Sequence, residues 1–325
     1  MRKFLTQIGL AIASVCITQG AAAQTDTEAR VPAIMKIVVP FSAGASNDAI
    51  ARAVAPWLAK RLRNTVIVEN KPGAAGVIGA DYVAKGPKDG SVLLLTSSTF
   101  LTAAATQLRL PYDPLTAFAP VAMVGQGPLL LAVSAATSIK TPADLVATAR
   151  AKPDALTYGS SGMGSIAHMA TEMLSDGAKI QLKHVPYKGA ANALMDMAGG
   201  QIDLMISNYS SLVPQIKAGR VRAVAVTSRQ PSASFPDLPT LGAVAPGFAA
   251  DIWVSILAPA GTPAPLVQKL NRELIEIANQ PEVRALLESD GALPTPLSPA
   301  ELTVRIRDDL ASWKKIATDK KIVAE

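Results

Sequence analysis

Two stretches of small residues have the types and spacing of anion-binding loops. The first, PFSAGASNDAIAR at 40–52, follows a strand-like apolar run and leads into a helical pattern that begins at about Asn47. A loop of Gly, Ala and Ser lets a ligand approach the backbone closely. The start of a helix offers unpaired N–H groups and the positive end of the helix dipole. This order of elements predicts a site for a small anion.

The second stretch, LTYGSSGMGSIAHMATEML at 156–174, repeats the order of strand, small-residue loop and helix start. If the two loops belong to two lobes that face one cleft, each brings a helix N-terminus with about half a positive charge. Such a pair of loops can hold a carboxylate or another anion with few or no charged side chains.

Enzyme motifs are incomplete in this chain. GMGSIA at 162–167 matches G-x-G-x-x-A, but the acidic residue that a dinucleotide site needs about 20 positions later is absent. Neither a P-loop nor G-x-S-x-G occurs. The two histidines are His168, which either lines the cleft or packs inside, and His184, which is interpreted as structural. We therefore predict no enzyme, no cofactor and no metal site.

The N-terminus has the pattern of a secretory signal peptide. Arg2 and Lys3 precede a short apolar run, and Ala21–Ala23 form an A-x-A cleavage site. Cleavage between Ala23 and Gln24 would leave 302 residues and remove Cys16, the single cysteine. The expected product is periplasmic, is soluble and cannot form a disulfide.

Length and charge bound the remaining possibilities. About 300 residues suggest two lobes rather than one core. The formal charge of +6 falls to +4 after cleavage, and no basic tract favours nucleic acid.

Strand-like and helical segments alternate, which predicts an α/β protein with largely parallel sheets. Helix starts are marked by TPAD at 141–144 and SPAE at 298–301, with Thr141 and Ser298 as N-caps.

Ordered motifs along nearly the whole mature chain resemble one known family. They are VVPFSAGASNDAIAR, VIVENKPGAAGVIGADYVAKGPKDGSVLLL, LPYDP, YGSSGMGSIAHMA, HVPYKGAANALMDMAGGQIDLM, AGRVRAVAVTS, FPDLPT and W-x₄-APAGTP. The chain resembles the Bug-type extracytoplasmic solute receptors, which are the substrate-binding proteins of tripartite tricarboxylate transporters.

The resemblance implies a type II periplasmic-binding-protein fold, with two α/β lobes that close over a ligand cleft. Domain 1 would combine 33–133 with 252–325, and domain 2 would span 134–251. The implied ligand is a small carboxylate, and the implied partners are the membrane subunits of the transporter. The chain itself is expected to be a monomer.

The family's ligand contacts carry over to several short segments, mainly through backbone N–H groups, hydroxyls and ordered water. The ligand-binding residues implied are Ser42, Ala43, Gly44, Ala45, Ser46, Asn47, Thr96, Ser97, Ser161, Gly162, Gly164, Ser165, His168, Asn208 and Tyr209. Ser98 is expected to reach the cleft with Thr96 and Ser97, although solvated loop hydroxyls are an equally good interpretation of all three. Asp48 would organise the first loop. Gly73 and Gly76 would either approach the ligand or form a structural turn.

Two positions depart from the family pattern, since the family usually has Gly-Gly at Gly44–Ala45 and often Thr at Asn47. The leading function is capture of a carboxylate for a membrane transporter. A ligand sensor for a two-component signalling system is the alternative that the sequence leaves open. An exported hydrolase is disfavoured because no catalytic constellation is present.

Overall fold

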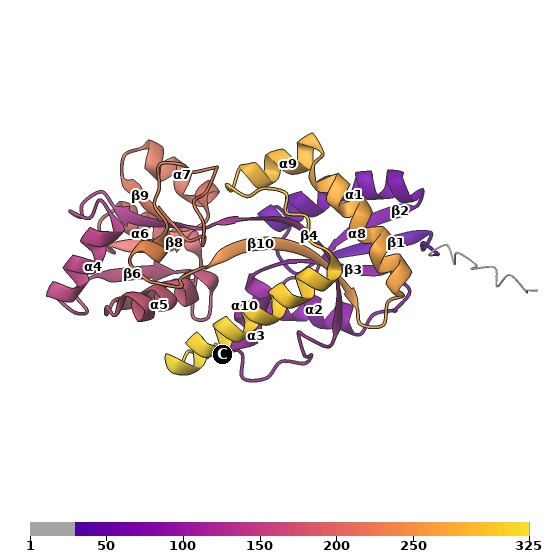
Figure 1. Ribbon diagram of the computed structural model, residues 1–325, viewed down its shortest axis with the longest axis horizontal. Helices are drawn as coiled ribbons and strands as arrows, with labels where there is room; N and C mark the ends of the chain where they lie inside the picture. The colour runs from indigo at the N-terminus through magenta and orange to yellow at the C-terminus, as the bar shows by residue number, and fades with distance from the viewer. Residues whose placement is uncertain (1–29, 325) are drawn as a thin grey trace, which may run out of the picture.

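Two five-stranded sheets divide the described residues, 30–324, of this computed structural model into two lobes (Figure 1). The predicted signal peptide lies outside these residues. The strands are β1 Ile34–Val39, β2 Thr65–Asn70, β3 Val92–Ser97, β4 Phe118–Pro128, β5 Leu130–Ser134, β6 Thr157–Ser160, β7 Lys183–Pro186, β8 Leu204–Ser207, β9 Val221–Val226 and β10 Asp251–Pro259. The predicted α/β fold with two lobes is confirmed.

Helices cover both faces of each sheet. They are α1 Ser46–Leu62, α2 Val77–Ala84, α3 Thr99–Thr106, α4 Pro142–Ala151, α5 Ile166–Ala178, α6 Ala190–Ala198, α7 Tyr209–Lys217, α8 Ala264–Ala278, α9 Pro281–Glu288 and α10 Pro299–Asp319, with short 3₁₀ turns at Ala74–Gly76 and Leu241–Ala243. Among the described residues, no helix is both long enough and apolar enough to cross a membrane.

The two sheets have equivalent strand orders. Lobe 1 has the order β2-β1-β3-β10-β4, and lobe 2 has the order β7-β6-β8-β5-β9. In each sheet the second strand pairs in parallel with the first and the third, whereas the fourth pairs antiparallel with both of its neighbours. By position, β1 therefore corresponds to β6, and β3 corresponds to β8.

The prediction of largely parallel sheets is wrong, because half of the strand pairings are antiparallel. The chain leaves lobe 1 along β4 and returns along β10, and these two long strands run between the lobes (Figure 1). Strands that cross the same gap in opposite directions must pair antiparallel. The chain changes sheet at Leu129, between β4 and β5, whereas the expected domain boundary at 133/134 falls at the end of β5.

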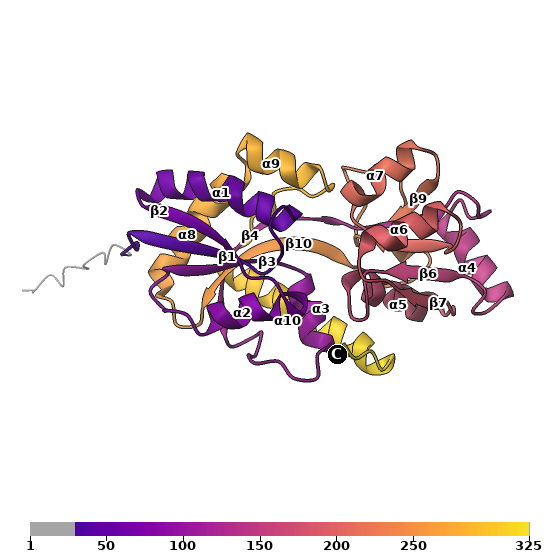
Figure 2. The same cartoon turned by 180° about the vertical axis from the view of Figure 1, so that it is seen from behind.

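The hydrophobic core is continuous between the lobes on one side of the sheets. One cluster joins Leu94 and Trp253 of lobe 1 to Tyr158 and Leu204 of lobe 2, and it includes Trp313 of α10. Figure 2 shows α10 passing beyond its own lobe toward α5. The C-terminal helix therefore links the lobes in addition to the two crossover strands.

Local sequence signals fix several helix starts. Thr141 and Ser298 each form a capping box with the acid three residues later, Asp144 and Glu301, as the sequence predicts. Ser165 is the N-cap of α5 and accepts a hydrogen bond from the N–H of His168. These caps depend only on residues within one helical turn, so they set the helix starts independently of tertiary packing.

Candidate functional site

The predicted site residues lie at the carboxyl ends of topologically equivalent strands. The loop at 40–45 joins β1 to α1, and the loop at 161–165 joins β6 to α5. Thr96 and Ser97 end β3, and Asn208 follows β8. Since the carboxyl ends of neighbouring parallel strands share one edge of a sheet, each lobe gathers its predicted residues at a single edge, where open α/β sheets usually bind ligands.

Asp48 holds the first loop from inside. Its Oδ2 accepts hydrogen bonds from the Gly44 N–H at 2.9 Å and from Arg52 Nε at 3.0 Å. Its Oδ1 accepts one from Asn70 Nδ2 at 2.9 Å, and the same amide also donates to the Phe41 carbonyl at 3.1 Å. The side chain is buried, so this network and the helix start replace the water that the carboxylate loses.

These contacts lower the pKa of Asp48. The hydrogen bond from Arg52 is the main cause, and the bonds from Gly44 and Asn70 add to it against the opposing effect of burial, so that the pKa is about 2. The group is thus ionised throughout the neutral range. It serves as an acceptor that shapes the loop, and it is poorly suited to take a proton from a ligand.

Gly44 turns the exposed tip of the first loop. Its φ of +84° lies in the left-handed region, and a Cβ placed there would meet nothing within 4 Å. Gly76 lies beside the start of the same loop, because a Cβ on Gly76 would come within 3.4 Å of Pro40. Gly73 and Gly76 both have positive φ and flank Ala74 and Ala75, so these four residues form a strained turn that packs against the first loop.

The hydroxyls at the end of β3 are buried. Thr96 and Ser97 lie within the strand and are almost fully buried, although the family resemblance implies that they reach the cleft. The Ser98 hydroxyl accepts a hydrogen bond from the Trp253 N–H at 2.9 Å and donates to the Asp251 carbonyl at 3.2 Å. Ser98 therefore joins β3 to β10, which is a structural use of a residue expected to reach the cleft.

Several N–H groups of the second loop are already bonded within the loop. The Gly162 N–H donates to Ser160 Oγ at 3.2 Å, and the Ser165 N–H donates to the Gly162 carbonyl at 3.2 Å. The Gly164 N–H donates to His168 Nδ1 at 3.1 Å. By contrast, the N–H groups of Ile166 and Ala167, in the first turn of α5, have no acceptor within the helix.

His168 packs beneath the second loop, which is one of the two roles that the sequence leaves open. It is 3% exposed, and its ring stacks on His184 with centroids 3.9 Å apart. His184 Nε2 lies 2.7 Å from Ser160 Oγ. Burial lowers the pKa of each imidazole to about 4, so both rings are neutral at pH 7. The pair fixes the shape of the loop without contributing charge.

Gly164 lies where the second loop meets lobe 1. Its φ is +72°, and a Cβ there would come within 2.6 Å of Thr106 Oγ1 and 3.2 Å of the Ala324 Cβ. Thr106 ends α3, and its carbonyl accepts the Ala324 N–H at 3.0 Å. A glycine is therefore required by contact between the lobes as well as by the turn.

The start of α7 makes a second contact between the lobes. Asn208 is the N-cap of α7, and the ring of Tyr209 packs edge-on against Phe235 with centroids 4.9 Å apart. The next residue, Ser210, donates its N–H to Asp290 Oδ1 at 3.2 Å. Sequence reasoning missed Asp290, because no local pattern connects it with residues 80 or more positions away.

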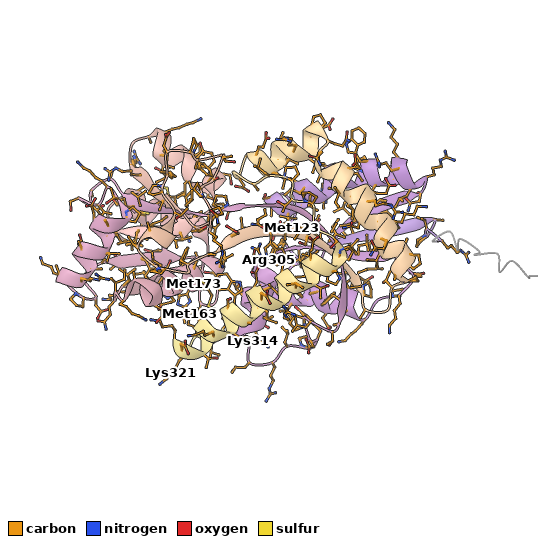
Figure 3. The ribbon with its side chains drawn as sticks, in the orientation of Figure 1. Met123, Met163, Met173, Arg305, Lys314 and Lys321 are labelled. Carbon is orange, nitrogen blue, oxygen red and sulfur yellow. The ribbon has the colours of Figure 1, made fainter. Side chains whose placement is uncertain are left out.

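A cavity of about 700 Å³ with charged and apolar lining residues lies near the crossover strands, and none of the predicted site residues lines it. Its lining includes Asp251, Asp309 and Arg305, and Figure 3 shows Arg305 on α10 in the region between the lobes. Arg305 donates to Asp309 at 2.8 Å and to Gln126 at 2.9 Å. Burial raises the pKa of Asp251 to about 6. These groups connect α10 to both crossover strands.

No group of three or more potential metal ligands occurs among residues 30–324. The site thus consists of two small-residue loops, two helix starts and internally bonded side chains. It offers hydrogen-bond donors to an anion. The one serine bonded to a histidine ring among residues 30–324, Ser160 with His184, is fully buried and is therefore closed to a substrate.

Two α/β lobes joined by two crossover strands, with anion-type loops at equivalent sheet edges, define the two-lobed fold of periplasmic solute-binding proteins. The family described as "Tripartite tricarboxylate transporter family receptor", TctC, matches residues 50–322. The chain belongs to this family, which consists of periplasmic solute-binding proteins and not of enzymes. The Bug-type resemblance seen in the sequence is therefore confirmed.

Individual relatives are similar over most of the chain. Protein BugT of Bordetella pertussis is 33% identical over 324 residues, which cover 98% of each protein. The structure "R. palustris Rpa4515 with adipate" has a TM-score of 0.76 and 32% identity, covering 89% of this chain and 98% of that one. MatC from Rhodopseudomonas palustris with bound malate has a TM-score of 0.72 and 30% identity, covering 87% and 98%.

Proposed function

We propose that this protein captures a small carboxylated metabolite in the periplasm and delivers it to the membrane subunits of a tripartite tricarboxylate-type transporter. The observation that carries the proposal is the pair of equivalent loop–helix junctions, β1–α1 and β6–α5, one in each lobe. The adipate and malate bound by two structural relatives support a carboxylate as the class of ligand.

The ligand would be held mainly by backbone donors. The first-turn N–H groups of Ser46 and Asn47 in α1, and of Ile166 and Ala167 in α5, have no acceptor within their helices. Ser42, Ala43 and Ser161 are exposed on the two loops and add N–H groups or hydroxyls. A carboxylate between the two helix starts would satisfy donors from both lobes and thereby favour closure.

Proline substitutions can remove single donors without breaking the helices. Ser46 and Ile166 are the first residues of α1 and α5, where proline is well tolerated, and α4, α9 and α10 already begin with proline. The residues before them, Ala45 and Ser165, have extended backbones that suit a following proline.

The test starts from a thermal-shift screen of the mature protein against a panel of mono-, di- and tricarboxylates. A ligand at 100 times its Kd adds about 2.7 kcal/mol of stability. For the best compound, Ser46→Pro and Ile166→Pro should each weaken binding at least tenfold by calorimetry, whereas Ser46→Ala and Ile166→Val, which keep the N–H, should bind much more tightly than their proline counterparts. A panel without any binding carboxylate refutes the ligand class. Unchanged affinity in both proline variants refutes the two-loop site.

Export and delivery need their own measurements. We propose that the mature protein begins at Gln24, is a soluble monomer and binds the transporter's membrane subunits. Mass spectrometry of the exported protein should give a chain of 302 residues, and a lipid-modified Cys16 would contradict this localisation. Uptake of the labelled ligand should be lost in cells that lack the protein. Normal uptake with loss of a transcriptional response would support the sensor role instead.

A further inference from the structure

Asp290 is a buried carboxylate that bridges the two lobes. It follows α9 and is 8% exposed. Its Oδ2 accepts a hydrogen bond from Ser46 Oγ at 3.2 Å, and its Oδ1 accepts one from the Ser210 N–H at 3.2 Å. Ser46 begins α1 in lobe 1, and Ser210 is the second residue of α7 in lobe 2. One side chain therefore joins the N-terminal turns of helices from both lobes.

The charge of Asp290 is balanced by helix ends. Among the ion pairs of residues 30–324, none includes Asp290. Each helix N-terminus carries about half a positive charge, so α1 and α7 together offset much of one carboxylate. Figures 1 and 2 both place α9 between α1 and α7. This arrangement exists only while the two lobes are close together.

The next residue strengthens the same contact. A Cβ on Gly291 would come within 2.3 Å of the ring of Phe235, so the backbone of the loop lies directly against lobe 2. Phe235 in turn packs against Tyr209, one of the predicted ligand-binding residues. Asp290 is consequently fixed beside the proposed site, because it contacts Ser46 directly and Ser210 follows Asn208 and Tyr209.

We propose that Asp290 is a specificity-determining residue. Its own carboxylate, rather than one from a ligand, is the anion that joins the lobes at the starts of α1 and α7. This inference rests on the proposed function. Asp290 accepts a hydrogen bond from a backbone N–H in α7 but only from the Ser46 hydroxyl in α1, so the N–H groups of α1 stay available to one ligand carboxylate, while the positive end of α7 is partly neutralised. A ligand carboxylate placed there meets a buried like charge, whereas a methyl or an ammonium group does not. The site therefore selects ligands with one carboxylate over dicarboxylates of the same length.

Matched ligands and variants test this selection. The ligands are adipate, hexanoate and 6-aminohexanoate, and the shorter series succinate, butyrate and 4-aminobutyrate, in which only one end of the molecule changes. Calorimetry should show that wild type binds the better monocarboxylate of at least one series tenfold or more tightly than the dicarboxylate. In Asp290→Asn this ratio should shrink at least tenfold.

Glu288→Gln is the matched control. It removes one negative charge two positions earlier, from a half-exposed side chain paired with Arg284, and it should leave the ratio unchanged. A preference of wild type for the dicarboxylate in both series overturns the inference even if Asp290→Asn fails to fold. An equal ratio in wild type and Asp290→Asn, or an equal change in Glu288→Gln, also overturns it while leaving the proposed function intact. If no carboxylate of the wider panel binds, the proposed function and this inference fall together.

Discussion

Gly164→Ala should separate the cost of a strained turn from the cost of a contact between the lobes. At Gly164 the φ of +72° costs a non-glycine residue about 1 kcal/mol. The new Cβ would also lie 2.6 Å from Thr106 Oγ1 and 3.2 Å from the Ala324 Cβ. Overpacking of this kind typically costs about 1–3 kcal/mol more. We therefore expect the free energy of unfolding to fall by about 2–4 kcal/mol, or the lobes to move apart to relieve the clash.

Gly219→Ala provides the matched control for this prediction. Gly219 has a φ of +68°, but a Cβ there would meet nothing within 4 Å, so only the backbone strain of about 1 kcal/mol should appear. Urea denaturation gives both free energies, and small-angle scattering reports any increase in the radius of gyration. A double-mutant cycle with Thr106→Ala should recover part of the excess cost. If Gly164→Ala and Gly219→Ala show equal destabilisation and the same radius, the second loop does not pack against lobe 1 as the structure indicates.

Three further substitutions test the charges and caps. Asp251→Asn should flatten the dependence of stability on pH. The pKa of Asp251 is raised from 3.8 to about 6, so between these pH values the folded state holds a proton that the unfolded state has released. Wild-type stability therefore falls as the pH rises from 3.8 to about 6. A pH series of urea melts in which the two proteins differ by a constant amount would contradict that assignment. Asp48→Asn should lower the free energy of unfolding by about 1–3 kcal/mol at pH 7. The pKa of Asp48 is lowered from 3.8 to about 2, so its ionised form stabilises the fold above pH 3.8, and this stability is lost as the pH falls through 2. An unchanged melt at pH 7 would show that the network with Arg52 contributes nothing. Thr141→Ala should cost about 1 kcal/mol through loss of the cap, whereas Thr303→Ala, on the exposed side of α10, should stay within about 0.5 kcal/mol of wild type, and equal effects would argue against the capping box.

The predicted loops and helix starts depend on local chemistry, and the structure places them where the sequence does. Thr141 and Ser298 cap their helices because Ser and Thr side chains bond to N–H groups only three residues away. The order of strand, small-residue loop and helix is equally local in both lobes. Which residues touch the ligand stays a prediction for Ser42, Ala43 and the other loop positions.

The sequence misjudged the orientation of the crossover strands. Residues 128–134 are predicted as an apolar strand, but composition does not reveal that β4 begins at Phe118 and continues between the lobes, or that β10 returns beside it in the opposite direction. The pairing of β10 with β4 joins residues more than 120 positions apart. Strand direction in such a pair follows from the path of the whole chain, which no short window contains.

The sequence by itself determined the class of protein, the alternation of strands and helices, and the two small-residue loops, because each depends on the order and spacing of nearby residues. Only the tertiary structure decided how the groups in those loops are used. It assigned the Gly164 N–H to His168, set Gly164 against Thr106 of the other lobe, and brought Asp290 to Ser46 across 244 positions of sequence. The physical reason is that hydrogen bonds, steric contacts and charges act over a few ångströms of space, so residues far apart in sequence compete for the same donors once the lobes pack together.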